Sequence, residues 1–556
     1  MAELGEASWI MSGNRPLHGW VHRPTGSAVK GAVVIAPPLA REQVISYRSL
    51  RVLAIMLAQQ GWVAIRFGWT GTGESAPMPE SADPVALWHQ DLQAVVGLAE
   101  RIVEPGKVHA LGLRVGAALL ASAPLDLGKR LLWEPVGGRM FLRQQSMLRA
   151  MSLPEDPVVP QDAGVEVNGA LFLPHQASAL SAVPNPAKAP PGTLPPGTEI
   201  SVETDVNRSR KVHSVASIHA EVPTESLQRL IDSFPESGRP VLQRPWAPVR
   251  AITLAAPAGR RIVEELVEVG PDRLPGVYSR PLGSSSGTEA AAFFVAASAE
   301  PKDGVTALWV EAARNLAARG VPALRAERRG CGDLGVPEAL MDPNPYTLEA
   351  IEDTENTAAW LHAKTGGSVT GIGLCVGAWL VSMASEHAPI DRVVMFNNVA
   401  WRSDADYFRR AFDEWNIADD PVDVLSSAAR DQRHRASLKS TVKELLRAKA
   451  PYPLWLTLGR HSIANTPEVL MDIGSRQSEL RLYFGPVDHQ HFISERGPAG
   501  LRNLQRSGRV VTHHAEPVLD HSLMGHAARL RSLSIIEELF PLRETGPRPQ
   551  REPGLS

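Results

Sequence analysis

The chain has 556 residues, of which 44% are hydrophobic and 21% are charged, a balance typical of globular proteins. This length exceeds what one hydrophobic core normally organises, so we expect two domains. The formal net charge of −3 gives no electrostatic reason to expect a nucleic-acid partner or an anionic membrane surface. No apolar run is long enough for a transmembrane helix, so we expect no membrane insertion.

The patterns of strand and helix alternate along the first part of the chain. The apolar run Lys30–Pro37 predicts a buried strand, Tyr47–Ala54 reads as a helix, and Gly61–Phe67 predicts a second strand. This second strand ends at the glycine-bearing turn Gly71–Ser75. Strand, helix and strand joined by short glycine-bearing connections indicate a doubly wound parallel sheet.

A proline-rich stretch, Val183–Thr198, separates the two halves of the sequence. Proline fixes φ and lacks a backbone donor, so the stretch predicts an exposed linker. An antiparallel ribbon is expected over Ile252–Val277, after which the earlier order recurs. The recurring elements are the strand Ala290–Ala297, the helix Leu308–Ala318, the strand Gly320–Arg325 and the turn Gly330–Asp333.

Both halves contain the layout of a nucleophile elbow, G-x-S-x-G, between a strand pattern and a helix pattern. Residues 373–377 read Gly-Leu-Cys-Val-Gly, which puts Cys375 at the nucleophile position. Residues 112–116 read Gly-Leu-Arg-Val-Gly, with Arg114 at that position, and a guanidinium cannot attack a carbonyl. The matching order of several landmarks predicts a tandem duplication with a degenerate first copy.

The chain contains only two cysteines, Cys331 and Cys375, and therefore no disulfide framework. We expect a protein of the reducing cytoplasm, because the first ten residues also lack the pattern of a signal peptide. Asp488, His489 and His491 lie close together in the sequence, but a loop cluster without a fourth partner at ligand spacing does not predict a metal site. We expect no metal and no other cofactor.

On the strength of the elbows and the Gly-x-Gly turns, both halves resemble the α/β-hydrolase fold, in particular the serine-aminopeptidase-like bacterial hydrolases. The second half also resembles a subgroup found with surface-polysaccharide export systems, whose elbow reads Gly-Leu-Cys-x-Gly-Ala, as residues 373–378 do here. In that subgroup the elbow follows a turn of the form Arg-x-x-x-x-Gly-x-Gly-Asp, which residues 325–333 match.

The resemblance implies an α/β fold of two tandem α/β-hydrolase-like domains, each with a mainly parallel doubly wound sheet. We expect the degenerate domain at residues 1–177, a proline-rich connecting segment at 178–250, and the second domain at 251–545. The charged, helix-patterned stretch 402–450 lies between the strand Arg392–Phe396 and an expected strand, Leu454–Gly459. An insertion at this point predicts a helical lid.

The family order of nucleophile, acid and histidine makes His521 the expected base for Cys375. His521 follows the strand-like run Arg509–His513 and precedes the terminal helix Ala527–Phe540. The alternative interpretations are a buried structural cysteine and an ordinary surface histidine. At the helix N-terminus, the Cys375 thiolate would be stabilised by the helix dipole.

No carboxylate follows the expected strand Leu454–Gly459, so the orienting residue has to come from elsewhere. Asn397 or Asn398 at the end of the preceding strand, or Asp404 or Asp406 a few residues on, are the substitutes; we take Asn398. The expected oxyanion hole uses the backbone N–H of Val376 and one from the loop near Ser298.

These expectations predict a hydrolase or acyltransferase that acts on a small-molecule ester or thioester through Cys375 and His521. In the first copy, Arg114 replaces the nucleophile and no histidine occurs in Ala220–Leu361, where the base would lie. The competing hypothesis is a non-catalytic binding or scaffold protein with the same fold. The missing carboxylate favours this alternative, whereas the coexistence of Cys375 and His521 disfavours it.

Overall fold

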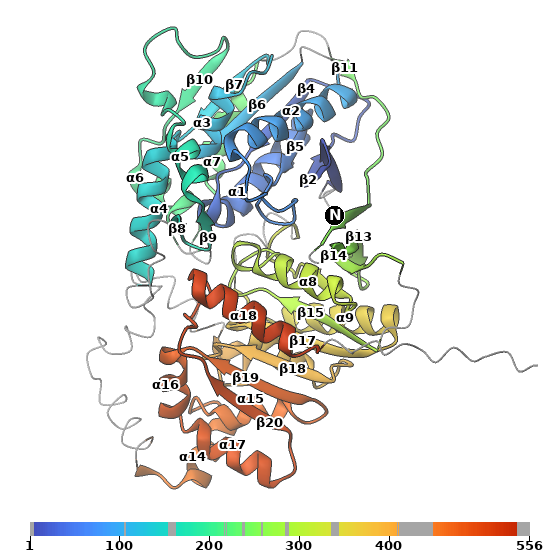
Figure 1. Ribbon diagram of the computed structural model, residues 1–556, viewed down its shortest axis with the longest axis vertical. Helices are drawn as coiled ribbons and strands as arrows, with labels where there is room; N and C mark the ends of the chain where they lie inside the picture. Colours follow the sequence, from blue (N-terminus) through green and yellow to red (C-terminus); the bar gives the residue numbers. More distant parts are fainter. Residues whose placement is uncertain are drawn as a thin grey trace, which may run out of the picture.

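Two mainly parallel β-sheets, one in each half of the chain, organise the protein (Figure 1). The computed structural model describes residues 5–104, 107–153, 163–215, 217, 220–235, 240–256, 259–283, 289–334, 344–408, 410, 447 and 449–541. The N-terminal half lies above the C-terminal half in Figure 1. The expected α/β fold class is confirmed.

The N-terminal sheet has seven strands in the spatial order β1-β2-β5-β4-β6-β7-β10. The pairs β1–β2 and β2–β5 are antiparallel, and the other pairs are parallel. Every residue of β4 is buried, because parallel strands are covered by helices on both faces. The strand bounds are β1 (Glu6–Ser12), β2 (Arg15–His22), β4 (Gly31–Ala36), β5 (Trp62–Phe67), β6 (Val108–Leu113), β7 (Arg130–Trp133) and β10 (Thr198–Ser201).

Helices cover both faces of this sheet. One face packs against α1 (Ala40–Gln59), α6 (Val206–His213) and α7 (Thr224–Asp232), and the other against α2 (Pro84–Ile102) and α3 (Val115–Ser122). Between β7 and β10 the chain forms α4, a small hairpin and α5. Their bounds, with those of a second small ribbon, are α4 (Gly138–Ser152), β8 (Val165–Val167), β9 (Ala170–Phe172), α5 (Pro174–Ser181), β3 (Ala28–Val29) and β11 (Val241–Leu242).

The C-terminal sheet has nine strands in the spatial order β12-β13-β14-β16-β15-β17-β18-β19-β20. The first three pairings in this order are antiparallel, and the remaining ones are parallel. The bounds are β12 (Ala251–Ala255), β13 (Arg261–Val269), β14 (Leu274–Pro281), β15 (Ala290–Val295), β16 (Ala323–Ala326), β17 (Ser368–Leu374), β18 (Arg392–Phe396), β19 (Glu479–Phe484) and β20 (Val511–Ala515).

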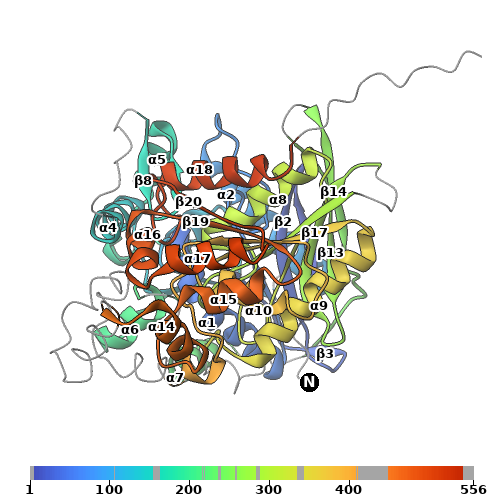
Figure 2. The same cartoon turned by 90° about the horizontal axis from the view of Figure 1, so that it is seen from below.

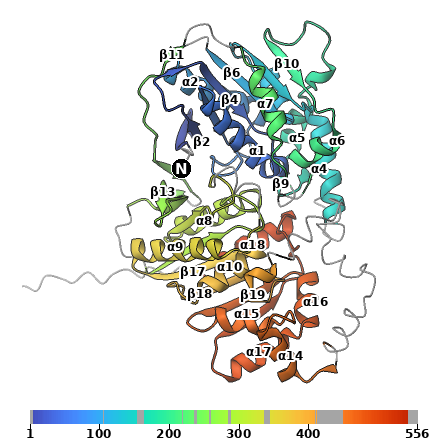
Figure 3. The ribbon, with the colours of Figure 1, turned by 180° about the vertical axis from the view of Figure 1, so that it is seen from behind.

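The C-terminal sheet is likewise enclosed by helices. α8 (Leu308–Ala318) and α18 (His526–Glu538) cover one face (Figure 1), and the other is covered by α9 (Leu348–Thr365), α10 (Val376–Ala384) and α15 (Pro467–Gly474), as Figure 3 shows. The view from below shows both helical layers with the sheet between them (Figure 2). The remaining helices are α14 (Tyr452–Arg460), α16 (Pro486–Ser494) and α17 (Gly497–Arg506). None of the described helices is long and apolar enough to cross a membrane.

The two sheets share one order of strands. The series β1-β2-β5-β4-β6-β7-β10 in the first sheet matches β13-β14-β16-β15-β17-β18-β19 in the second, strand by strand and with the same directions. The strands β12 and β20 extend the second sheet at its edges. In both sheets the strand that leads into the Gly-x-x-x-Gly elbow is therefore internal, flanked by parallel neighbours.

The expected strand Leu454–Gly459 is wrong, because these residues belong to α14. Its buried residues, Trp455 and Gly459, are four positions apart, which is a helical spacing. The alternation of leucines with other residues imitated a strand pattern. The strand that follows β18 in the sheet is instead β19, formed by the alternating sequence Glu-Leu-Arg-Leu-Tyr-Phe.

The first sheet extends past the expected boundary at residue 177, because β10 pairs with β7. The proline-rich stretch therefore lies within the first half of the fold, between α5 and β10. Pro186 is buried and Leu194 packs against the first core, so the stretch is not a free spacer. Most of the expected lid at 402–450 lies outside the described residues.

Candidate active site

Cys375 lies at a sharp turn between β17 and α10, as the elbow pattern predicts. Its backbone has φ 53° and ψ −117°, a conformation that is costly for any residue other than glycine. The flanking glycines are required by close backbone contacts. A Cβ at Gly373 would lie 2.3 Å from the carbonyl carbon of Gly377, and one at Gly377 would lie 2.3 Å from the carbonyl oxygen of Val295.

The structure brings Cys375 together with His521 and a carboxylate, Asp488. His521 lies in the loop between β20 and α18, and its Nδ1 is 2.8 Å from Asp488 Oδ1 in the first turn of α16. Cys375 lies near enough to His521 to raise the pKa of the imidazole. All three side chains follow the carboxyl ends of parallel strands, namely β17, β19 and β20. Groups arranged in this way can act as a nucleophile, a base and an orienting acid.

The electrostatics of this group favour a charged histidine. Burial lowers the pKa of His521, but the adjacent Asp488 carboxylate and Cys375 raise it by more, so its pKa lies well above the usual value. The Asp488 side chain is 3% exposed, whereas that of His521 is 40% exposed. A histidinium held beside a thiol stabilises the thiolate, which is the nucleophilic form of cysteine.

The expectation that Asn398 orients His521 is wrong, because the ring nitrogen is bonded to Asp488 instead. Asn398 is fully buried, and its Nδ2 donates to the carbonyl of Ala400 at 2.9 Å. The error follows from the misassigned strand. Once the strand is placed at 479–484, the next carboxylate along the chain is Asp488, in the position that the family order requires.

Two of the other residues considered for the acid, Asp404 and Asn397, make different contacts. Asp404 Oδ1 accepts a hydrogen bond from the backbone N–H of Tyr407 at 3.1 Å, which is a local turn contact. Asn397 acts on the backbone of the histidine loop, since its Nδ2 donates to the carbonyl oxygens of Asp520 and His521, at 2.8 and 3.1 Å.

Asn397 also holds the loop that carries the acid. Its Oδ1 accepts the backbone N–H of Gly485 at 2.8 Å, three residues before Asp488, and the asparagine itself is fully buried. A Cβ at Gly485 would lie 2.1 Å from the carbonyl oxygen of Leu519, so the two loops touch at this point. Asn397 therefore fixes the loop that carries Asp488 and the loop that carries His521 relative to each other.

The residues predicted for the oxyanion hole lie on segments that meet at the elbow. Val376 is the first residue of α10, and Gly377 packs against the carbonyls of Val295 and Ala296, where the loop with Ser298 begins. Ser298 has a positive φ of 46°. Within the described part of the chain, the backbone N–H groups of Val376 and Ser298 make no backbone hydrogen bond.

A group of aromatic side chains lies in the hydrophobic core that includes α10. Burial raises the pKa of Tyr346, and the electrostatic effect of Cys375 raises it further. The Tyr346 ring stacks on Phe408 with a centroid distance of 4.4 Å and meets Trp379 edge-on at 5.3 Å. All three rings are buried, so they belong to the hydrophobic core beside α10.

The elbow of the N-terminal half has the same backbone geometry as that of the C-terminal half. Arg114 has φ 56° and ψ −124°. Its N–H donates to Trp133 O at 3.0 Å, just as the N–H of Cys375 donates to Phe396 O at 2.9 Å. A Cβ at Gly116 would lie 2.2 Å from the carbonyl oxygen of Pro37, directly after β4. The matching contact at Gly377 is with the carbonyl oxygen of Val295, at the end of β15.

The side chain of Arg114 is engaged within its own half of the fold. Its Nη2 lies 3.2 Å from Glu42 Oε1 and 2.9 Å from Gln144 Oε1. His213, which the sequence pattern did not single out, is also buried in this half. Burial is the larger cause that lowers the pKa of His213, and the positive charge of Arg114 lowers it further, to about 3. Its ring nitrogens contact the hydroxyls of Ser209 and Ser214. This elbow holds a buried ion pair and no nucleophile.

Comparison with known proteins gives structural similarity only. No protein-family model matches the chain, and no curated protein matches its sequence. An esterase from Pyrobaculum calidifontis is 12% identical with a TM-score of 0.31, over 50% of this chain and 83% of that one. A dienelactone hydrolase from Anabaena variabilis ATCC 29413 is 13% identical with a TM-score of 0.31, over 52% and 97%. An esterase/lipase from an uncultured bacterium is 16% identical with a TM-score of 0.30, over 50% and 84%.

Proposed function

We propose that the protein is a hydrolase or acyltransferase that acts on a small ester or thioester through Cys375, His521 and Asp488. The observation that carries this proposal is the chain of contacts from the Asp488 carboxylate through His521 to the thiol at a strained elbow. Strained backbone is retained where surrounding structure and function require it. The similar proteins named as esterases, lipases and dienelactone hydrolases support the same class of reaction.

The chemistry follows from the positions of these groups. The Cys375 thiolate attacks the carbonyl carbon of the substrate, and the N–H groups of Val376 and Ser298 stabilise the resulting oxyanion. The carbon–oxygen or carbon–sulfur bond to the leaving group then breaks, and His521 donates its proton to that group. An acyl-cysteine thioester remains. Neutral His521 next removes a proton from water or an acceptor alcohol, amine or thiol, which attacks the acyl group and releases the thiolate.

We also propose that the N-terminal half is a catalytically inactive copy of the C-terminal half, arising from a tandem duplication. The shared order of strands and the matching backbone of the two elbows support this. Arg114, bound to Glu42, replaces the nucleophile. One catalytic site per chain is expected.

The first test is intact-mass measurement after brief exposure to substoichiometric iodoacetamide at neutral pH. Fast single labelling is expected for the wild type, no fast labelling for Cys375→Ala, and labelling slowed roughly 10-fold or more for His521→Ala, because the thiolate loses its histidinium. Cys331 serves as an internal control, since it is 2% exposed and burial, the largest cause, raises the pKa of its thiol.

The second test is a panel of nitrophenyl esters and acyl thioesters followed by intact-mass detection of the acyl-enzyme. A mass increase equal to the acyl group, absent in Cys375→Ala, is expected. Slow alkylation that is indifferent to His521, together with no acyl adduct from any ester or thioester, would contradict the proposal and favour the non-catalytic binding or scaffold protein.

A further inference from the structure

The loop that follows β15 is strained along much of its length. Ser298, Thr306 and Ala307 have positive φ angles of 46°, 43° and 63°. Such a conformation is costly for a residue other than glycine and persists only when its surroundings hold it in place. This segment, residues 296–307, carries the proposed oxyanion donor of Ser298, so its conformation bears directly on the proposed chemistry. We call it the oxyanion loop.

Within its own half, the oxyanion loop is anchored by Lys302. The Lys302 N–H donates to Glu327 Oε2 at 3.2 Å, and its Nζ lies 3.3 Å from Glu327 Oε1 and 3.2 Å from Asp333 Oδ2. All three side chains are at most 3% exposed. One lysine therefore faces two buried carboxylates. A buried group with this excess of negative charge needs a second cation.

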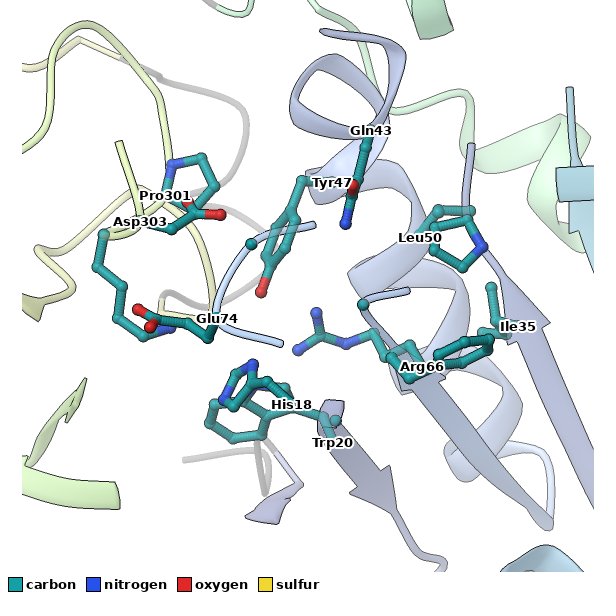
Figure 4. A pocket seen from close by; sticks show the side chains of 16 residues that line it. His18, Trp20, Ile35, Gln43, Tyr47, Leu50, Arg66, Glu74, Pro301 and Asp303 are labelled. Atoms are coloured by element: carbon teal, nitrogen blue, oxygen red, sulfur yellow. The ribbon is translucent and has the colours of Figure 1, made fainter. Parts of the chain in front are cut away.

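The N-terminal half supplies that cation. Arg66 Nη2 lies 2.5 Å from Asp333 Oδ1, and the Tyr47 hydroxyl donates to the same carboxylate at 2.8 Å. Both residues line a cavity at the junction of the two halves, opposite Pro301 and Asp303 of the oxyanion loop (Figure 4). Arg66 thus adds a second cation beside the carboxylates that Lys302 faces.

Other parts of the N-terminal half contact the same loop. A Cβ at Gly73 would lie 3.1 Å from Asp303 Oδ2, and one at Gly169 would lie 2.1 Å from Thr306 Oγ1, so two glycine turns fit closely against it. Burial raises the pKa of Glu300 to about 7, and the nearby positive charge of Arg41 opposes that rise. The contacts extend over the loop from residue 300 to residue 306.

We propose that the N-terminal half positions the oxyanion loop of the C-terminal site, with Tyr47 and Arg66 acting through Asp333 and Lys302. The proposal rests on the proposed function for its catalytic consequence, but not for its structural one. Tyr47 and Arg66 are positioning residues, because neither touches Cys375 or His521 within the described contacts. The catalytically empty copy would thus be retained as a support for the active one.

The test is Tyr47→Phe, which removes the hydrogen bond to Asp333 without changing charge. Faster hydrogen–deuterium exchange is expected in the peptide covering residues 296–307. With the best ester found in the substrate panel, kcat should fall roughly 10-fold at unchanged KM, because a small displacement of an oxyanion donor weakens transition-state stabilisation. The rate of Cys375 alkylation should not change, since alkylation forms no oxyanion.

Tyr452→Phe is the matched control, because the Tyr452 hydroxyl also donates to a carboxylate, Glu468, at 2.7 Å, but in α14 and α15 away from the oxyanion loop. It should leave exchange in residues 296–307 and kcat unchanged. Arg66→Met should reproduce the effect of Tyr47→Phe more strongly, and Arg66→Lys should restore part of it. Far-ultraviolet circular dichroism checks that each variant is folded.

The outcomes separate this proposal from the proposed function. Unchanged exchange of residues 296–307 in both Tyr47→Phe and Arg66→Met overturns the positioning role, whatever the enzyme does. Equal loss of kcat and alkylation in Tyr47→Phe also overturns it, because that pattern means general disruption of the site. Faster exchange of the loop in a protein whose wild type neither alkylates quickly nor turns over substrate supports the positioning role while contradicting the proposed function.

Discussion

At the scale of single residues, the two elbows show how backbone geometry and chemistry separate. Arg114 and Cys375 share the same strained φ and ψ within a few degrees and the same backbone hydrogen bond to the neighbouring strand. The strain is therefore a property of the turn between a strand and a helix. Only the side chain decides whether the turn presents a nucleophile or, as with Arg114 and Glu42, a buried ion pair.

Asp488→Asn is expected to lower kcat/KM by roughly 10²-fold, within the range usual for loss of acid–base assistance. The carboxylate raises the pKa of His521, so its removal should lower that pKa. The histidinium that stabilises the thiolate would then be lost at a lower pH. The measurement is the rate of Cys375 alkylation from pH 5 to pH 9, with and without the substitution.

Asp404→Asn is the matched control for this change. Asp404 was a candidate for the acid on sequence grounds, yet its carboxylate contacts the backbone of Tyr407. Its pH profile of alkylation should overlay that of the wild type. If Asp404→Asn shifts the profile and Asp488→Asn does not, the assignment of the acid is wrong.

At the scale of elements, glycine makes the approach of α10 to the sheet feasible. Gly377→Ala would bring a Cβ to 2.3 Å from the backbone oxygen of Val295, an atom that cannot rotate away. We expect a loss of about 1–3 kcal/mol in the free energy of unfolding, the usual cost of overpacking. The measurement is urea denaturation followed by tryptophan fluorescence.

Gly97→Ala provides the comparison within a helix that has room. Gly97 lies in α2, and its added Cβ would meet only the end of the flexible Arg101 side chain, at 3.8 Å. Alanine is the better helix former by about 0.5–1 kcal/mol, so this variant should be as stable as the wild type or more so. Equal destabilisation by both substitutions would show that contact with Val295 is not the cause.

At the scale of the whole molecule, a buried network of charges joins the two halves. Arg325 Nη2 lies 2.7 Å from Glu74 Oε2 of the N-terminal half and 3.0 Å from Glu264 Oε1 of its own half. Arg314 Nη2 lies 2.7 Å from Glu264 Oε2 and donates to the backbone oxygen of Glu74 at the same distance. The turn Gly71–Ser75 is one of the elements that recur in both halves of the sequence. Through Glu74 it contacts the C-terminal half.

This network predicts that the protein loses stability in acid. Burial raises the pKa of Glu264, but Arg314 and Arg325 lower it more, to about 2. A carboxylate with a depressed folded-state pKa contributes stability above its unfolded pKa, about 4.3, and loses it as pH falls toward 2. The free energy of unfolding, measured in urea at pH 5, 4 and 3, should decline. The decline should be smaller in Glu264→Gln.

Glu268→Gln tests whether replacing any arginine-paired glutamate of β13 would reduce the loss of stability in acid. Glu268 is bonded to Arg273 at 2.7 Å, but both side chains are exposed, at 44% and 69%. Exposed pairs contribute little because water and salt screen them. This variant should keep the acid dependence of the wild type, and a loss equal to that of Glu264→Gln would remove the buried network as the explanation.

The sequence by itself determined what depends on local pattern. The elbow glycines, the strands with continuous apolar runs and the internal helix Leu308–Ala318 were predictable, because close backbone approach and burial on both faces leave a direct mark on the residues. Cys375 and His521 followed from position relative to such elements. The repeated spacing of the two elbows anticipated the shared strand order.

Only the tertiary structure decided the partner of His521 and the contacts of the first half with the second. Asp488 and His521 are 33 residues apart, and their contact depends on β19 and β20 lying side by side, which one misread strand was enough to hide. The pairs of Tyr47 and Arg66 with Asp333 join residues more than 260 positions apart. Such contacts leave no periodic pattern in the amino-acid sequence, because the energy of a buried ion pair depends on distances that exist only after folding.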